Sequence, residues 1–192
     1  RDVERSRGLG DVYKRQIFFC FTVHSQNIEN KYIQLDMATK DGRFIISNKF
    51  ELARNNTENI EATISLLKSN DSDSIITIIS LSIFQKTPNR INANDTCLFK
   101  LSNNQILTLT AMEDCKQQRS NGYSLISPDF KIDESQIILL KSNFITKIRI
   151  QNGASYTDWN NIINDSKGKF TTYYDEMILR MNQKKKSITD GF

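Results

Sequence analysis

The chemistry open to this chain is limited by its histidines. The only histidine is His24, which follows the apolar run 17–23 near the start of the sequence. Downstream of it the chain has no residues for a Ser-His-Asp or Cys-His arrangement, and no histidine to hold zinc or non-haem iron. The glycine-rich nucleotide motifs and the HExxH metal motif are also missing from the sequence. We therefore expect no catalytic residue of these classes, no metal site and no cofactor.

Paired carboxylates leave one catalytic route open, because two Asp or Glu side chains suffice for glycoside hydrolysis. Asp71 and Asp73 are close together in the polar segment 70–73. This composition is more typical of a plain turn, and the later ligands of an EF-hand calcium loop are missing. A small carboxylate-dependent glycan hydrolase therefore remains the alternative to our main hypothesis.

Tyr156 and Trp159 are the candidate ligand-binding residues. Aromatic rings of this kind offer a platform to a sugar or a peptide. The competing interpretation, which we favour for Trp159, is that a single Trp near the start of a helix is part of the core.

Cys97 and Cys115 could form a disulfide in an oxidising compartment. The hairpin register predicted below pairs Cys97 with Ala111, which counts against a direct cross-strand bridge. We leave the disulfide open and favour two separate thiols.

The element that organises the chain is a predicted β-hairpin within residues 94–112, NDTCLFKLSNNQILTLTAM. A two-residue loop at 103–104 would pair Leu101 with Ile106 and leave both faces mixed. A three-residue loop at 103–105 pairs Leu101 with Leu107 and makes one face wholly apolar. A buried face selects register, so we predict the second arrangement, with a left-handed residue in the loop. The apolar face is then formed by Cys97, Phe99, Leu101, Leu107, Leu109 and Ala111.

Residues 1–16 do not resemble part of a domain. The stretch DVYKRQ at 11–16 resembles the in-frame translation of a transposase mosaic-end adapter, which is common in metagenomic assemblies. We interpret residues 1–16 as an assembly artefact and exclude them. They carry five basic and three acidic side chains, so the formal charge of the remainder is +2 rather than +4. The charge therefore gives no reason to expect a nucleic-acid partner.

Residues 17–25 are interpreted as the end of a truncated signal peptide. The apolar run IFFCFTV is too short to span a bilayer and precedes polar residues, with cleavage expected just before Gln26. The competing interpretation is a buried first strand. Residues 26–192 are then predicted to form a single globular β-rich domain, exported by a bacterium to the periplasm or the medium, with no transmembrane segment.

The remaining elements indicate an α+β fold that is mainly antiparallel and sandwich-like. Strands are predicted over 31–39, 43–47, 60–68, 74–85, 123–132 and 145–151. The first half of 74–85 is apolar on both faces, which predicts a central strand covered on both sides. A short helix is expected near 134–142, with Asp133 or Ser135 as its cap. An amphipathic C-terminal helix is expected near 166–184, lying on a sheet, with a cap among residues 164–166.

From about residue 74 to 181 the order of these features resembles a group of small, uncharacterised secreted proteins of Bacteroidota-type bacteria. The resemblance rests on the long apolar strand, the Asn94-Asp95 entry, the hairpin, and the stretches DESQIILLKS and ITKIRI. It implies export and a β-rich fold, and it implies no activity.

We therefore expect an exported, non-enzymatic binding or accessory module. Its expected partner is a protein or glycan of the cell surface.

Overall fold

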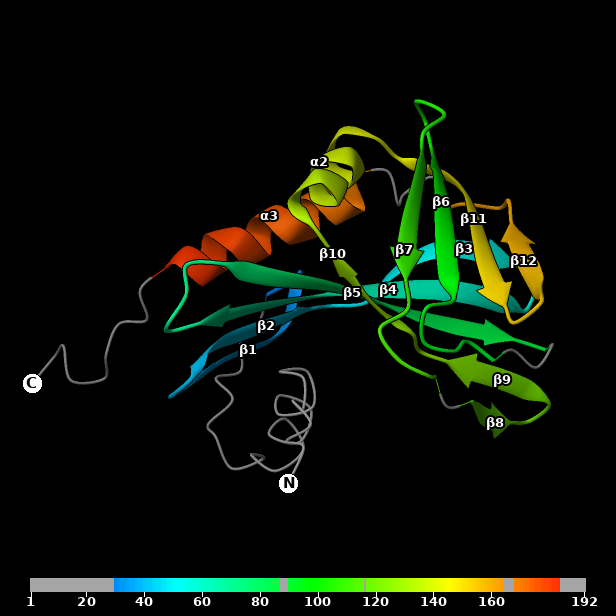
Figure 1. Cartoon of the computed structure of the whole chain (residues 1–192), viewed down its shortest axis with the longest axis horizontal. Coiled ribbons are helices and arrows are strands. Elements are labelled where there is room, and N and C mark those ends of the chain that lie inside the picture. Colours follow the sequence, from blue (N-terminus) through cyan, green and yellow to red (C-terminus); the bar gives the residue numbers. More distant parts are fainter. Residues whose placement is uncertain (1–29, 87–89, 116, 164–167, 184–192) are drawn as a thin grey trace, which may run out of the picture.

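The computed structural model of the chain describes residues 30–86, 90–115, 117–163 and 168–183 (Figure 1). The predicted artefact at 1–16 and the predicted signal segment at 17–25 lie outside the described residues. The described residues form two antiparallel β-sheets and two helices, which confirms the predicted α+β, mainly β fold.

The larger sheet, sheet A, has eight strands in the order β1-β2-β4-β5-β9-β8, with β3 also paired to β4 and β10 to β5. Its strands are β1 (Ile33–Thr39), β2 (Gly42–Ser47), β3 (Phe50–Asn55), β4 (Glu58–Ser69), β5 (Ile75–Gln85), β8 (Gln118–Ser120), β9 (Tyr123–Ile126) and β10 (Asp129–Ile132). Because β4 and β5 are long, each pairs with two different strands along one edge: β4 with β3 and then β2, and β5 with β10 and then β9.

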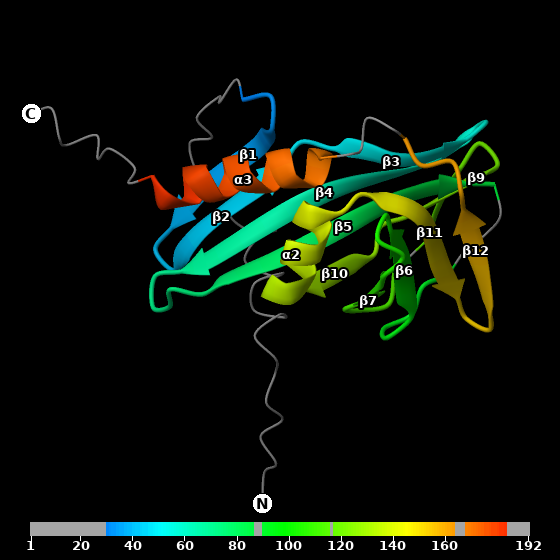
Figure 2. The ribbon, with the colours of Figure 1, turned by 90° about the horizontal axis from the view of Figure 1, so that it is seen from above.

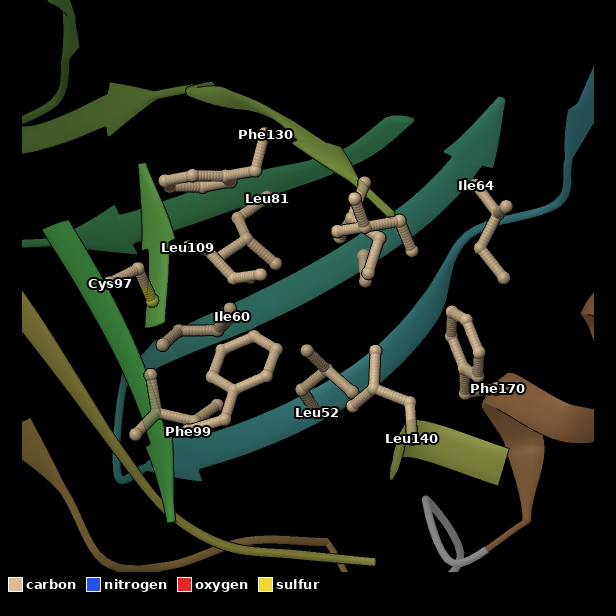
Figure 3. Close-up of a cluster of buried hydrophobic side chains, with 14 of the residues drawn as sticks. Leu52, Ile60, Ile64, Leu81, Cys97, Phe99, Leu109, Phe130, Leu140 and Phe170 are labelled. Atoms are coloured by element: carbon tan, nitrogen blue, oxygen red, sulfur yellow. The ribbon is translucent and has the colours of Figure 1, made fainter. Parts of the chain in front are cut away.

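The smaller sheet, sheet B, has four strands in the order β12-β11-β6-β7. These strands are β6 (Thr96–Leu101), β7 (Ile106–Thr110), β11 (Ile145–Asn152) and β12 (Ser155–Trp159). Sheet B stands across one end of sheet A (Figure 1). The two sheets share the core: Figure 3 shows Leu52, Ile60 and Leu81 of sheet A with Cys97, Phe99 and Leu109 of sheet B.

The loop of the β6–β7 hairpin contains three residues, as predicted, but begins one residue earlier. Leu101 donates its N–H to the carbonyl of Gln105, and Asn104 donates its N–H to the carbonyl of Leu101, both at 2.9 Å. The loop is therefore 102–104 rather than 103–105. This position gives the left-handed conformation to Asn104, at φ 66°, whereas the predicted loop would give it to Gln105. Asn tolerates that conformation better than Gln.

The shifted loop corrects the predicted pairing and preserves the predicted faces. Cys97 pairs with Leu109 rather than with Ala111. Each β6 residue therefore pairs with a β7 residue two positions earlier than predicted. Because side chains alternate with a period of two, every side chain of the hairpin remains on its predicted face. All six residues of the predicted apolar face are buried: Cys97, Phe99, Leu101, Leu107, Leu109 and Ala111.

Helix α2 (Glu134–Ser142) confirms the predicted short helix and its cap. The Asp133 carboxylate accepts the N–H of Gln136 at 2.9 Å, and the Gln136 side chain accepts the N–H of Asp133 at 3.0 Å. This reciprocal pair satisfies two N–H groups that the helix cannot bond internally. Leu140 of α2 is buried against the sheet core (Figure 3).

Helix α3 (Lys169–Asn182) confirms the predicted C-terminal helix, with shorter bounds. Its N-cap is Gly168, which makes no side-chain cap hydrogen bond, and the predicted caps at 164–166 lie outside the described residues, as does the basic run 184–186. The helix lies over β2 and β4 (Figure 2). Its buried side chains are Phe170, Met177 and Met181.

A buried ionic cluster fixes the C-terminal end of α3 to the sheet. The side chain of Asp36 on β1 is fully buried and accepts a two-pronged contact from Arg43, at 2.9 and 2.8 Å, and a third bond from Arg180 of α3 at 2.9 Å. Arg43 also donates to the carbonyls of Met181 and Gln183 at the end of the helix. One carboxylate thus joins β1, β2 and α3.

Among the described residues, the first half of β5 is covered on one side only, whereas cover on both sides was predicted. Both helices and sheet B lie on the same face of sheet A (Figure 2). Ile79 points into the core, whereas Ile76 on the other face is 39% exposed and Ile78 is partly buried. Partly buried apolar side chains of the neighbouring strands share this outer face: Leu35, Met37, Phe44, Ile46 and Leu67.

Three strands were not predicted, and one predicted strand is interrupted. The unpredicted strands are β3, β8 and β12. The predicted strand over 123–132 is divided into β9 and β10 at Ser127-Pro128, because proline has no N–H for the ladder. The Pro128 carbonyl accepts the N–H of Leu81 at 3.0 Å, so the break remains attached to β5.

The Asp36→Asn variant tests the ionic cluster. It keeps the side-chain shape, and it leaves the mostly buried Arg43 and the partly exposed Arg180 without their buried counter-charge. We therefore expect a loss of about 3 kcal/mol in the free energy of unfolding. The matched control is Glu51→Gln, whose partner Arg54 is exposed, with an expected loss of about 1 kcal/mol or less. Urea unfolding measures both values, and equal losses would contradict the account of α3 attachment.

Candidate functional site

The outward side of sheet B carries the best candidate for a functional surface. Strand alternation turns eleven side chains of the four strands away from the core. We call this set the Tyr156 face: Thr96, Leu98 and Lys100 on β6, Ile106, Thr108 and Thr110 on β7, Lys147, Arg149 and Gln151 on β11, and Tyr156 and Asp158 on β12. Tyr156 is 62% exposed. Ile106, at the hairpin end of the face, is 63% exposed.

Tyr156 is held by a cation beside its ring. The guanidinium carbon of Arg149 lies 4.1 Å from the ring centroid, which is close enough for a cation–π contact. Arg149 is itself fixed by Asp158, which pairs with it across the strands. The exposed ring is therefore held by the Arg149–Asp158 ion pair rather than by packing in the core.

Asp158 receives two cations. Arg149 donates to its two oxygens at 2.6 and 2.9 Å, and the Lys147 ammonium lies 2.6 Å from Oδ2. These contacts, Arg149 first, hold the pKa of the Asp158 carboxyl well below its usual range. The same pair raises the pKa of Arg149. Asp158 therefore stays ionised and bonded, and it is not available as a general acid at neutral pH.

A second feature of the face is an excess of positive charge. Lys100, Lys147 and Arg149 stand against a single acid, Asp158, which gives the face a formal charge of +2. Lys100 lies directly opposite Lys147 in the β6–β11 register. Like charges in this position destabilise a sheet. Such a departure from good local design is expected at a functional site.

The two predicted ligand-binding residues do not share a surface. Tyr156 and Trp159 are three positions apart on β12, so they point to opposite sides of sheet B. Trp159 is 1% exposed and belongs to the core, opposite Ile148 of β11. Its indole nitrogen has no hydrogen-bond partner among the described residues. The structure therefore leaves Tyr156 as the aromatic residue accessible to a ligand on this strand.

The other predicted site residues show no reactive arrangement. Asp71 and Asp73 are exposed in the β4–β5 turn, where Lys68 lies 3.7 Å from Asp73. Cys97 and Cys115 are not joined by a disulfide, and burial raises the pKa of the Cys97 thiol, which keeps it protonated. Within the described part of the chain, no group of three or more His, Cys, Asp or Glu side chains is placed to hold a metal ion.

A small basic hollow lies at the β8–β9 hairpin. Its volume is about 240 Å³, and it is lined by Lys86, Gln117, Arg119, Asn121, Gly122, Tyr123 and Ser124. This volume is below the range of roughly 300–1,000 Å³ that is usual for small-molecule sites. The lining contains no carboxylate, so the hollow does not offer the paired acids that glycoside hydrolysis requires.

No protein-family model, curated protein or solved structure matches this chain. None of the described helices combines the length and the apolar character needed to cross a membrane. The Tyr156 face is therefore the candidate site on its geometry alone.

Sequence reasoning found Tyr156 and missed the residues that support it. The alternation of ITKIRI shows from the sequence alone that Lys147 and Arg149 share a face. The pairing of Arg149 with Asp158 could not be predicted, because β12 was not predicted and its register is set by the turn after β11.

The Asp158→Asn variant tests the charged support by its pH dependence. An unfolded Asp has a pKa of about 3.9. Because the folded pKa is lowered, the wild-type advantage is fully present above that value and is lost as pH falls through the folded pKa. The side chains of Arg149 and Asp158 are 39% and 26% exposed. Because solvent screens such a pair, we expect a wild-type advantage of about 1 kcal/mol, constant from about pH 7 to pH 5 and smaller below about pH 4.

Urea unfolding of both proteins across this pH range provides the measurement. The matched control is Asp73→Asn, whose exposed carboxylate is 3.7 Å from its lysine, and which we expect to be near neutral at every pH. A wild-type advantage over Asp158→Asn that grows on acidification would contradict the assignment.

Proposed function

We propose that this protein is an exported, non-enzymatic binding module of a bacterial periplasm or cell surface, and that it contacts its ligand through the Tyr156 face. The observation that carries the proposal is a solvent-exposed tyrosine ring held in place by Arg149 and Asp158. Tyr and Arg are enriched where proteins bind partners, because they provide large contact area and directional bonds.

The charged groups of the Tyr156 face support binding rather than catalysis. It carries one acid, and both oxygens of that acid are bonded to cations. A glycosidase needs two carboxyl groups facing the substrate. No specific observation favours the hydrolase alternative.

Export is supported by the sequence of residues 17–25, an apolar run followed by polar residues. We expect protein made from its natural gene to begin at Gln26 and to be found in the periplasmic or secreted fraction. Mass spectrometry of the N-terminal peptide after cell fractionation measures both. A cytoplasmic protein that retains residues 17–25 would contradict export and would favour the buried-strand interpretation of that run.

Tyr156→Ala tests the binding surface. Wild type and variant are compared for binding to an array of bacterial surface polysaccharides and envelope proteins. We expect the variant to bind its array partner about tenfold or more weakly, as for a central aromatic contact. The matched control is Tyr123→Ala, which removes a ring from the hollow at β8–β9.

Loss of binding in Tyr123→Ala together with full binding in Tyr156→Ala would move the site to that hollow. The comparison requires that Tyr156→Ala has the same melting temperature as the wild type. We expect this because the Tyr156 ring is 62% exposed and does not belong to the core.

A further inference from the structure

We propose that the Tyr156 face binds an acidic polysaccharide, with its three cations contacting carboxylate or sulfate groups and Tyr156 packing on a sugar ring. This inference rests on the proposed function and deepens it by naming the chemical class of the ligand.

The opposed lysines provide the first argument. Lys100 and Lys147 are cross-strand partners on the outer face, which places two like charges side by side on neighbouring strands. Lys147 is partly neutralised by Asp158 at 2.6 Å. The exposed Lys100 side chain makes no ion pair with any described residue. An anion bound between the two lysines removes the repulsion and replaces it with two attractions.

The state of Asp158 provides the second argument. Its two oxygens are already occupied by Nε and Nη2 of Arg149 and by the Lys147 ammonium. The acid therefore fixes the cations in position while cancelling only one of the three positive charges of the face. The Nη1 nitrogen of Arg149 takes no part in these bonds and keeps donors for a ligand anion.

The extent of the charged surface favours a polymer over a small anion. Tyr156 pairs with Gln151, and Lys100 pairs with Lys147, which is four residues from Gln151 on the same strand. Strand spacings of about 4.8 Å and rises of about 3.4 Å per residue separate the backbones of Tyr156 and Lys100 by roughly 17 Å. This separation favours a chain of linked units over a single small anion.

The remaining composition of the face favours a sugar chain over an acidic peptide. Beside the charged strands, the edge strand β7 exposes two hydroxyl-bearing side chains, Thr108 and Thr110, together with the apolar Ile106. Leu98, on the inner strand β6, is partly buried. The face provides a ring, hydroxyls and cations, whereas a peptide is usually anchored by side chains inserted into pockets.

The experiment measures binding of the full chain to four soluble polymers by calorimetry at two salt concentrations. The polymers are polygalacturonate, its fully methyl-esterified form, dextran sulfate and poly-glutamate. The variants are Lys100→Met, Tyr156→Ala and the matched control Lys40→Met, which removes another exposed lysine, from the β1–β2 turn.

We expect polygalacturonate or dextran sulfate to bind, and the methyl-esterified polymer and poly-glutamate to bind at least about tenfold more weakly. Lys100→Met should weaken binding about fivefold and reduce its salt dependence, while Lys40→Met should not. Removing one of two opposed lysines should leave the melting temperature unchanged or higher, so weaker binding cannot be attributed to unfolding. Preference between the two acidic polymers distinguishes carboxylate from sulfate recognition.

Equal binding of the methyl-esterified polymer would overturn the acidic character of the ligand. The claim that the ligand is a sugar chain would be overturned in two cases. Poly-glutamate could bind as tightly as polygalacturonate, or Tyr156→Ala could bind the acidic polymers as tightly as the wild type. In each of these cases Tyr156-dependent binding on the array of surface polysaccharides and proteins would leave the proposed function standing. Absence of Tyr156-dependent binding in both experiments would remove the function and the ligand class together.

Discussion

The alternation of side chains along the four strands of sheet B is the constraint on which the rest of this structure depends. One face of the sheet closes the core against sheet A, with Phe99, Ile148 and Trp159 completely or almost completely buried. Because a strand has a period of two, this burial determines which residues point outward. Tyr156, Arg149 and Asp158 are outward for the same reason that their neighbours are inward. The inward side chains of these strands therefore determine the position of the candidate binding surface.

Sheet A provides a wide support that sheet B covers only in part. Helices α2 and α3 cover the remainder of the same face (Figure 2), and the buried Asp36 cluster fixes the end of α3. A fully buried carboxylate bonded to two arginines is costly to desolvate, and its value lies in fixing one arrangement of the three elements that it joins.

Local signals in the sequence predicted much of this fold, and non-local pairing accounts for what was missed. The hairpin faces, the Asp133 cap and the buried stripe of α3 depend on residues that are near each other in the chain. The unpredicted β3 and the one-sided cover of β5 depend on which distant elements reach the sheet. The same distinction applies to the site. Tyr156 could be proposed from its residue type alone, whereas its contact with Arg149 depends on the register of β12, a strand that was not predicted. Trp159 is three positions from Tyr156 on the same strand, so the alternation of side chains places it on the opposite face.

The central claim is that the outward face of sheet B is the ligand-binding surface of this molecule. The most direct measurement is a titration of isotope-labelled protein with polygalacturonate oligomers, followed by backbone amide chemical shifts in NMR. The account predicts that the largest shifts occur on β6, β11 and β12, around Lys100, Lys147 and Tyr156, and that amides of sheet A change little. Shifts concentrated at the β8–β9 hollow or on the outer face of sheet A, with β11 and β12 unchanged, would contradict it.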